Sequence, residues 1–230
     1  MKKLVRVLLG VVLCLQLTGC TMPFVGAPNR WECYEAFDAT MRASYRGDVG
    51  DYDDYAGPSE GQKLYDGEVR LYAYTLMYWA SVEPDYVDEE TFEGFLEVAR
   101  TVLAKVDWEI VGFYAVDNER GYDGIVEVYL YPTDLLDLMK DDIQDAIEAY
   151  NEVYTGDEET NYEEIERLYG WMILEIMQSY ADLAQPVSQP EKQLYWYAKD
   201  VDVFGEDGGI VISNTDWDEV DEVLMEIDRL

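Results

Sequence analysis

The segments WEIVGFYAV (residues 108–116) and IVEVYLY (residues 125–131) decide the fold of this chain. Both are rich in β-branched and aromatic residues, and the turn-rich segment DNERGYDG (117–124) separates them. Apolar and polar residues alternate in them, which is the period of a half-buried strand. They therefore predict an antiparallel β-hairpin, and Pro132 ends its second strand because proline cannot donate to the ladder.

A second hairpin is predicted at residues 193–204 and 210–213, around the turn GEDGG (205–209). Gly-Ile-Val followed by Thr-Asp occurs in both hairpins, at offsets of about 85 and 82 residues, and two predicted helices precede each hairpin. This similarity has two explanations, duplication of a helix-helix-hairpin unit or a chance match. The pattern also leaves open whether the two hairpins share one sheet.

Helical periodicity fills most of the remaining chain. Ser59 with Gln62 forms an expected capping box, Asp88 and Thr133 are expected N-caps, and residues 46–58 are expected to break the chain between two helices. In the helix after residue 161 we expect one inward apolar face, made of Ile165, Leu168, Met172, Ile176, Tyr180 and Leu183. The predicted helices are 31–46, 60–82, 89–105, 134–154, 162–184 and 216–230, which with the hairpins gives the α+β class.

The amino terminus has the features of a secretory signal. Lys2, Lys3 and Arg6 precede an apolar run at residues 7–15, which is too short for the roughly 20 apolar residues of a membrane-spanning helix. The run leads into Leu17, Thr18, Gly19 and Cys20. This tetrapeptide resembles the lipobox of bacterial lipoproteins, an aliphatic residue, a small residue, Gly or Ala, and then Cys.

The lipobox resemblance implies that Cys20 receives a diacylglyceryl group and that a peptidase cuts before it. Two acyl chains hold a protein firmly at a bilayer, since each buried methylene contributes about 0.8 kcal/mol. Residues 1–19 are then a signal peptide, residues 20–30 a lipidated cysteine with a flexible tether, and residues 31–230 one compact extracytoplasmic body. If the duplication is real, the body has halves at 31–132 and 133–230.

A wider resemblance starts from FDATMRASYRGDVGDYDDYAGPSEGQKLYDGEVRLY (residues 37–72), the aromatic hairpin and DGGIVISNTDWDEVDEVL (residues 207–224). The body is similar to a group of uncharacterised surface lipoproteins of Gram-positive bacteria, over most of residues 31–228. Because that group has no established activity, the resemblance implies location and architecture, and it carries no catalytic residues.

Composition excludes several functions. The chain has 50 acidic residues, 16 basic residues and a formal net charge of -34, which repels nucleic acid and anionic lipid headgroups. Histidine is absent, which removes Ser-His-Asp and Cys-His catalysis and His-ligated zinc. Once Cys14 leaves with the signal and Cys20 is lipidated, Cys33 has no disulfide partner, and we expect it to be buried and inert. The motifs of nucleotide-binding loops and of serine hydrolases are also missing, so we expect no enzyme activity and no cofactor.

Two kinds of ligand site remain candidates. Acidic loops could bind calcium weakly, although none has the EF-hand spacing and solvated loops are the simpler interpretation. These loops contain Asp48, Asp51, Asp53 and Asp54; Asp117, Asn118, Glu119 and Asp123; and Asp157, Glu158, Glu159 and Asn161. Aromatic clusters could stack on sugars or peptide, or fill the core. They are Tyr72, Tyr74, Tyr78 and Trp79, and Tyr195, Trp196 and Tyr197, of which Trp196 is the expected ligand contact.

The sequence thus predicts a lipid-anchored, extracytoplasmic protein of the bacterial cell surface, attached to the membrane through Cys20 and binding an unidentified protein or glycan. Two alternatives stay open. One is a structural or assembly lipoprotein of the envelope, and the other is a glycan hydrolase that uses paired carboxylates.

Overall fold

The computed structural model describes residues 30–115, 122–153, 162–190, 192–201, 210–212 and 214–227. It confirms the α+β class: helices pack against one antiparallel sheet. The helices are α2 (Arg30–Arg46), α3 (Gly50–Ala56), α4 (Glu60–Trp79), the 3-10 helix η1 (Pro84–Tyr86), α5 (Glu89–Leu103), α6 (Leu135–Val153), α7 (Tyr162–Ala181) and α8 (Asn214–Leu224). The strands are β1 (Asp107–Ala115), β2 (Tyr122–Tyr131), β3 (Lys192–Val201) and β4 (Ile210–Ile212).

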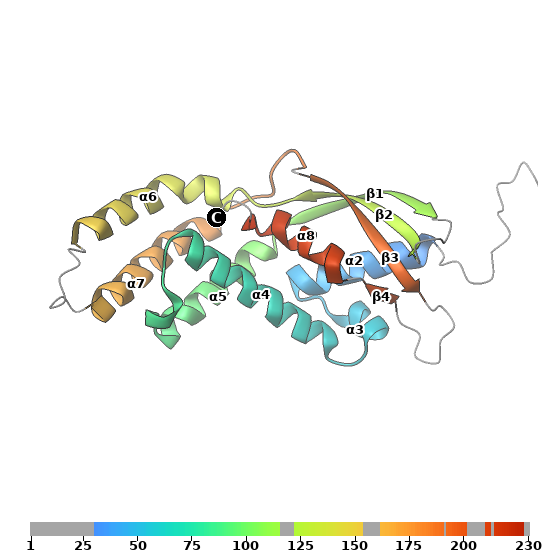
Figure 1. Cartoon of the computed structure of the whole chain (residues 1–230), viewed down its shortest axis with the longest axis horizontal. Coiled ribbons are helices and arrows are strands. Elements are labelled where there is room, and N and C mark those ends of the chain that lie inside the picture. Colours follow the sequence, from blue (N-terminus) through green and yellow to red (C-terminus); the bar gives the residue numbers. More distant parts are fainter. Residues whose placement is uncertain are drawn as a thin grey trace, which may run out of the picture.

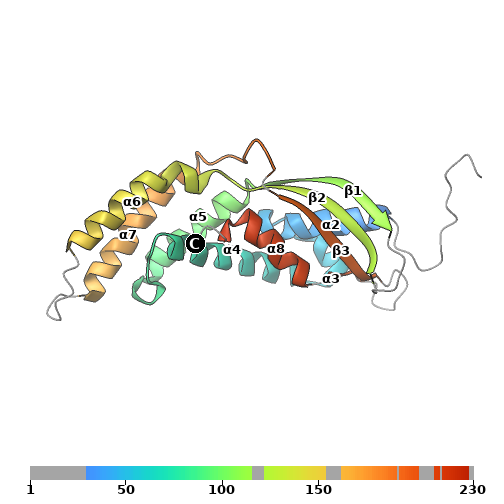
Figure 2. The ribbon, with the colours of Figure 1, turned by 45° about the horizontal axis from the view of Figure 1, so that its top comes forward.

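The two hairpins share one sheet, in the order β1-β2-β3-β4 with every neighbouring pair antiparallel. The strand period decides its faces, since alternate residues of a strand point to opposite sides. Val126, Val128 and Leu130 of β2 are fully buried on one side, with Trp108 and Ile110 of β1 opposite Leu130 and Val128. Helices α2 and α8 contact this inner face, and Figure 2 shows the sheet arching over them.

The body is elongated, with the sheet and α2 at one end and the α6–α7 pair at the other (Figure 1). Helix α4 runs between the two ends and packs against α2 and α5, and α5 packs against α7. A single cluster of buried residues runs through the molecule, with members from α2, α4, α5, β2, α6, α7 and α8, among them Phe37, Leu76, Phe95, Val128, Met139, Ile173 and Val220.

The structure corrects the expected start of α4. Ser59 does not cap the helix with its side chain, because its backbone is left-handed, with φ of 69°. The carboxylate of Asp53 does so instead, accepting from the amide nitrogens of Ser59 (3.1 Å) and Gly61 (2.7 Å). Asp53 belongs to α3, a short helix in the stretch that we expected to be only a break. The capping group therefore comes from the preceding element, where local spacing does not reveal it.

Of the two other expected N-caps, the one of α5 is confirmed and the one of α6 is wrong. Asp88 caps α5 as expected, accepting from the Thr91 amide at 2.8 Å. Thr133, the expected cap of the next helix, instead forms a β-bridge with Pro186, and α6 begins at Leu135. The carboxylate of Asp134 accepts from the Gln185 amide at 2.8 Å, so the residues before α6 are held by the segment that follows α7.

The apolar face of α7 also differs from the expectation. Met172, Ile176 and Tyr180 are partly buried against the core as expected, and Tyr169, Ile173 and Met177 are more fully buried. Leu168 is 55% exposed, and Leu183, 61% exposed, lies past the end of α7 at Ala181. The inward face is therefore centred about one residue from the expected stripe, which forms its edge. The physical reason is that α7 carries apolar residues on several sides, so the 3.6-residue period fits more than one phase.

Lys105, just after α5, forms hydrogen bonds with the carboxyl end of α7. Its Nζ donates to the carbonyl oxygens of Ala181 (2.8 Å), Asp182 (2.7 Å) and Ala184 (3.1 Å). A cation at a helix carboxyl terminus satisfies carbonyls that have no partner in the helix and interacts favourably with its dipole.

Replacing Lys105 by methionine is therefore expected to lower the free energy of unfolding by about 1–2 kcal/mol, since hydrogen bonds to a charged donor are lost. Denaturant unfolding measures the change, and Lys140→Met on the exposed side of α6 is the matched control. Equal effects of the two substitutions would contradict the role assigned to Lys105.

Candidate functional site

A groove runs between α5 and α7 in the half of the molecule away from the sheet. The helices approach closely where Gly94 of α5 meets Leu174 of α7. A Cβ on Gly94 would lie 2.4 Å from the Leu174 Cδ2, so Gly94 leaves room for this leucine in its present position. The resulting α5–α7 groove has a volume of about 960 Å³.

The α5 wall of the groove is acidic. It carries Asp88, Glu89, Glu90, Glu93 and Glu97, and α7 contributes Glu175 from the other side. Glu93 pairs with Arg100 at 3.0 Å, whereas among the described residues Glu89, Glu90 and Glu97 form no ion pair. Hydrogen bonds from the backbone and side chain of Thr91 hold the pKa of Asp88 below its ordinary range. The groove therefore holds a strongly negative potential near neutral pH.

Trp171 stands on the α7 rim of this groove and is 54% exposed. It belongs to the outward side of α7, whereas Gly170 and Ile173 on the inward side are buried. Large aromatic side chains stabilise a fold most when they are buried. An exposed indole beside a groove therefore indicates a surface that binds another molecule. Sequence analysis missed Trp171, because the phase expected for α7 did not identify its outer face.

A second hollow continues along α7 from the amino-terminal side of the groove. Asp85, Tyr86, Glu163, Glu164 and Arg167 line it, with a volume of about 580 Å³. The rings of Tyr86 and Tyr162 meet edge to face at 5.1 Å, which joins η1 to the start of α7. The acidic surface thus extends past the groove, with Arg167 as a cation between the two hollows.

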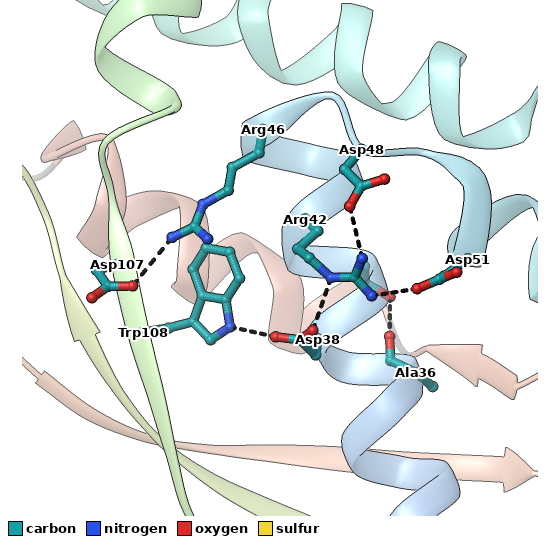
Figure 3. A network of polar contacts seen from close by, with 9 residues as sticks. Ala36, Asp38, Arg42, Arg46, Asp48, Asp51, Asp107 and Trp108 are labelled. Carbon is teal, nitrogen blue, oxygen red and sulfur yellow. Dashed lines mark hydrogen bonds and ion pairs between the residues drawn. The ribbon is translucent and has the colours of Figure 1, made fainter.

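A separate polar network lies near the sheet, where Arg42 of α2 binds three carboxylates (Figure 3). Its guanidinium contacts Asp38 at 2.8 Å, Asp48 at 2.7 Å and Asp51 at 2.5 Å. These contacts raise the pKa of Arg42 above its ordinary value, with the hydrogen bond to Asp51 as the largest cause. The network connects the end of α2 to α3.

The same network reaches β1. The Trp108 indole nitrogen donates to Asp38 at 3.0 Å, and the Arg46 guanidinium lies 4.2 Å from the centre of the Trp108 ring (Figure 3). Arg46 also pairs with Asp107 at 3.1 Å. A nearby hollow of about 510 Å³ includes Asp54 in its lining. Arg42, held by three carboxylates, therefore joins α2 to α3, and Asp38 and Arg46 connect α2 to β1.

Replacing Arg42 by glutamine is expected to lower the free energy of unfolding by about 1 kcal/mol, because surface ion pairs contribute little singly and more as a network. The loss should shrink at high salt, since the carboxylates that remain repel one another less strongly when screened. Urea unfolding at low and high salt measures it, and a salt-independent loss would contradict the electrostatic account.

The structure gives other roles to three acids of the expected calcium loop at residues 48–54. Asp48 and Asp51 pair with Arg42, and Asp53 caps α4. In the part of the chain that the structure describes, no three acidic or cysteine residues converge as metal ligands would. The other two expected loops lie wholly or partly outside the described residues.

The aromatic residues predicted as candidate ligand contacts differ in their exposure. Tyr72 is buried in the core, whereas Tyr78 is 58% exposed and stacks on Tyr74, with ring centres 6.5 Å apart. Trp196 is paired in register with Val126, and its side chain lies outside the described part of the structure, as does that of Cys33.

The lipobox residues Leu17, Thr18, Gly19 and Cys20 lie outside the described residues too. Among the described helices, none combines the length and apolarity needed to cross a membrane.

No protein-family model matches the chain, and no curated protein matches it. Among solved structures, the chain is similar to the crystal structure of a candidate lipoprotein, YcdA, from Bacillus subtilis subsp. subtilis str. 168. The identity is 12% and the TM-score is 0.49. The similarity covers 85% of this chain and 59% of that one, so the chain spans less than two thirds of its length.

Proposed function

We propose that the chain is a lipid-anchored, non-enzymatic binding module of the bacterial cell surface, which engages its ligand in the α5–α7 groove. Attachment rests on the sequence: a basic start, a short apolar run and the Leu17–Cys20 tetrapeptide stand in the order of a lipoprotein signal. Two acyl chains on Cys20 supply enough buried methylene groups for stable anchoring.

The observation that carries the binding role is Trp171, exposed on the rim of a groove. Pockets that bind ligands combine an apolar or aromatic anchor with polar groups that fix orientation. Trp171 and Leu174 supply the first, and the carboxylates of α5 supply the second. Tryptophan is enriched among residues that dominate binding energy, because it gives a large, rigid contact area.

Two features argue against assigning catalysis to this groove. The chain has no histidine to act as a general base near neutral pH. Glycan hydrolysis needs a carboxylic acid whose pKa is raised, and Asp88 does not meet that need, because the Thr91 hydrogen bonds lower its pKa.

A second candidate function, assembly of the envelope through protein contacts, is favoured by the α6–α7 end. Val153 and Leu168 there are each more than half exposed. An assembly surface would lose function on substitution of these residues, whereas a groove-binding module would lose it on substitution of Trp171. Paired variants, Val153→Ser with Leu168→Ser against Trp171→Ser, distinguish the two functions.

The anchor is tested by intact mass of membrane-extracted protein, comparing wild type with Cys20→Ser. The expected result is a chain that begins at Cys20 and carries added diacylglyceryl mass, which the variant lacks. Retention of residues 1–19 in the wild type, or cleavage at another position, would contradict the surface assignment.

A further inference from the structure

We propose that the α5–α7 groove accepts a cationic, amphipathic segment of a partner protein, with Lys or Arg side chains facing α5 and an apolar side chain packed on Trp171. This inference rests on the proposed binding function and names the chemistry of its partner. It follows from the shape, the charge distribution and the exposed indole of one groove.

The spacing of the acidic side chains indicates an extended partner. Glu89, Glu93 and Glu97 stand four residues apart on α5, so they form one row about 12 Å long at 1.5 Å per residue. A facing helix with Lys or Arg at every fourth position would repeat at the same 6 Å interval. An extended segment with a cation at every second residue would repeat at about 6.6 Å.

The same spacing argues against a single metal ion as the ligand. Calcium takes six to eight oxygen ligands at about 2.3–2.6 Å, which requires carboxylates that converge on one point. Within the described residues no such convergence occurs. Charges spread along a wall instead match a row of cations, each partly neutralising a neighbouring carboxylate.

Charge also argues against the other macromolecules that could cover an exposed groove. A second copy of this chain would bring another formal charge of -34, and nucleic acid or an anionic bilayer would meet the same repulsion. A basic segment gains from the whole field as well as from the groove, because complementary potentials speed encounter and reject partners of the wrong sign.

Trp171 gives the groove an element that charge alone lacks. Its exposed indole can pack against an aliphatic side chain and can also receive a Lys or Arg cation over the ring face. Leu174 is largely buried in the groove floor, beside Gly94. A purely hydrophilic polycation would make no contact with this apolar floor, so the preferred partner carries apolar side chains as well as cationic ones.

The test titrates the membrane-extracted chain, held in neutral detergent, with two synthetic peptides of equal length. One is an amphipathic helix, with Lys at every fourth position on one side and Leu on the opposite side, and the other has Glu in place of Lys. Calorimetry and tryptophan fluorescence give the dissociation constants at about 50 mM and about 200 mM salt. We expect saturable binding of the Lys peptide, weaker at the higher salt, and no binding of the Glu peptide.

Two variant pairs locate the site. The groove triple Glu89→Gln, Glu90→Gln and Glu97→Gln should weaken binding about tenfold, whereas Asp141→Asn, Asp145→Asn and Glu152→Gln on α6 should change it less than about twofold. Trp171→Ala should also weaken it about tenfold, while Tyr78→Ala, an equally exposed aromatic on α4, should not. Circular dichroism confirms that each variant remains folded.

Three outcomes would overturn the proposal: no saturable binding of the Lys peptide, equal losses in the groove and α6 triples, or saturable binding of calcium chloride alone that the groove triple abolishes. Failure here is distinguishable from failure of the anchor. The peptide titration does not depend on how the chain reaches the membrane, and the mass of the Cys20 modification does not depend on the groove.

Discussion

Gly61→Ala is expected to lower the free energy of unfolding by about 2–3 kcal/mol, although alanine is the better helix former by about 1 kcal/mol. A Cβ on Gly61 would lie 2.8 Å from the Val49 Cβ and 3.2 Å from the Val49 carbonyl oxygen. Neither atom is the free end of a flexible side chain. The start of α4 would have to move away from α3, which would also separate the Gly61 amide from the Asp53 carboxylate that caps it.

Gly67→Ala supplies the matched control on the same helix. No atom lies within 4 Å of a Cβ placed on Gly67, so the helix propensity of alanine should appear as a gain of about 1 kcal/mol. Urea unfolding of both variants measures the difference. Two changes of the same sign would contradict the close contact between α3 and α4.

At alkaline pH, stability is expected to fall steeply above about pH 10, because two fully buried tyrosines resist ionisation in the folded protein. Burial raises the pKa of Tyr45, with Asp221 and Glu68 adding to the effect. Burial also raises the pKa of Tyr72, with a contribution from Glu226. The Tyr45 hydroxyl donates to Asp221 at 2.5 Å, so the phenol joins α2 to α8.

The sign follows from proton linkage. In the unfolded chain these phenols lose protons near pH 10, whereas in the folded chain they keep them, so the stabilising contribution is present below pH 10 and is lost as pH rises toward the folded pKa. Each phenol contributes about 1.4 kcal/mol per pH unit, so the pair removes about 3 kcal/mol per unit. A decrease of this size over two units is comparable to the whole stability of many domains.

Tyrosinate absorbance recorded together with circular dichroism tests this prediction. We expect Tyr45 and Tyr72 to ionise only as the helical signal is lost. Tyr45→Phe should reduce the steepness of the alkaline decrease, and Tyr78→Phe, at an exposed position, should not. Ionisation of all the tyrosines near pH 10 in a protein that keeps its fold would contradict the buried positions.

Local patterns predicted most of the helices and strands because their causes are local. The alternation in residues 125–131 follows from one buried face of β2, and the Asp88 cap acts within its own first turn. The cap of α4 was missed because Asp53 stands eight residues before the amide of Gly61, in another helix. The sequence did not show that the two hairpins share one sheet, because β2 and β3, which pair, are far apart in the chain.

The candidate groove was not predicted from the sequence, also because it depends on contacts between distant segments. In the sequence, its acidic residues are typical of the solvated side of α5. Trp171 belongs to α7, which carries apolar residues on several sides. They form one surface because α5 and α7 pack side by side, with Leu174 against Gly94. Within the 50 acidic residues of the chain, charge alone could not mark these few. Trp196 and the lipobox residues remain sequence predictions.

Hydrogen–deuterium exchange of the full chain, with and without the amphipathic Lys peptide, tests the central claim most directly. The account predicts slower exchange on peptide addition in residues 85–97 and 163–178, which carry the groove and the adjoining hollow, with the sheet unchanged. Protection confined to the sheet or to α6, or spread evenly over the acidic surface, would contradict the assignment of the α5–α7 groove as the binding site.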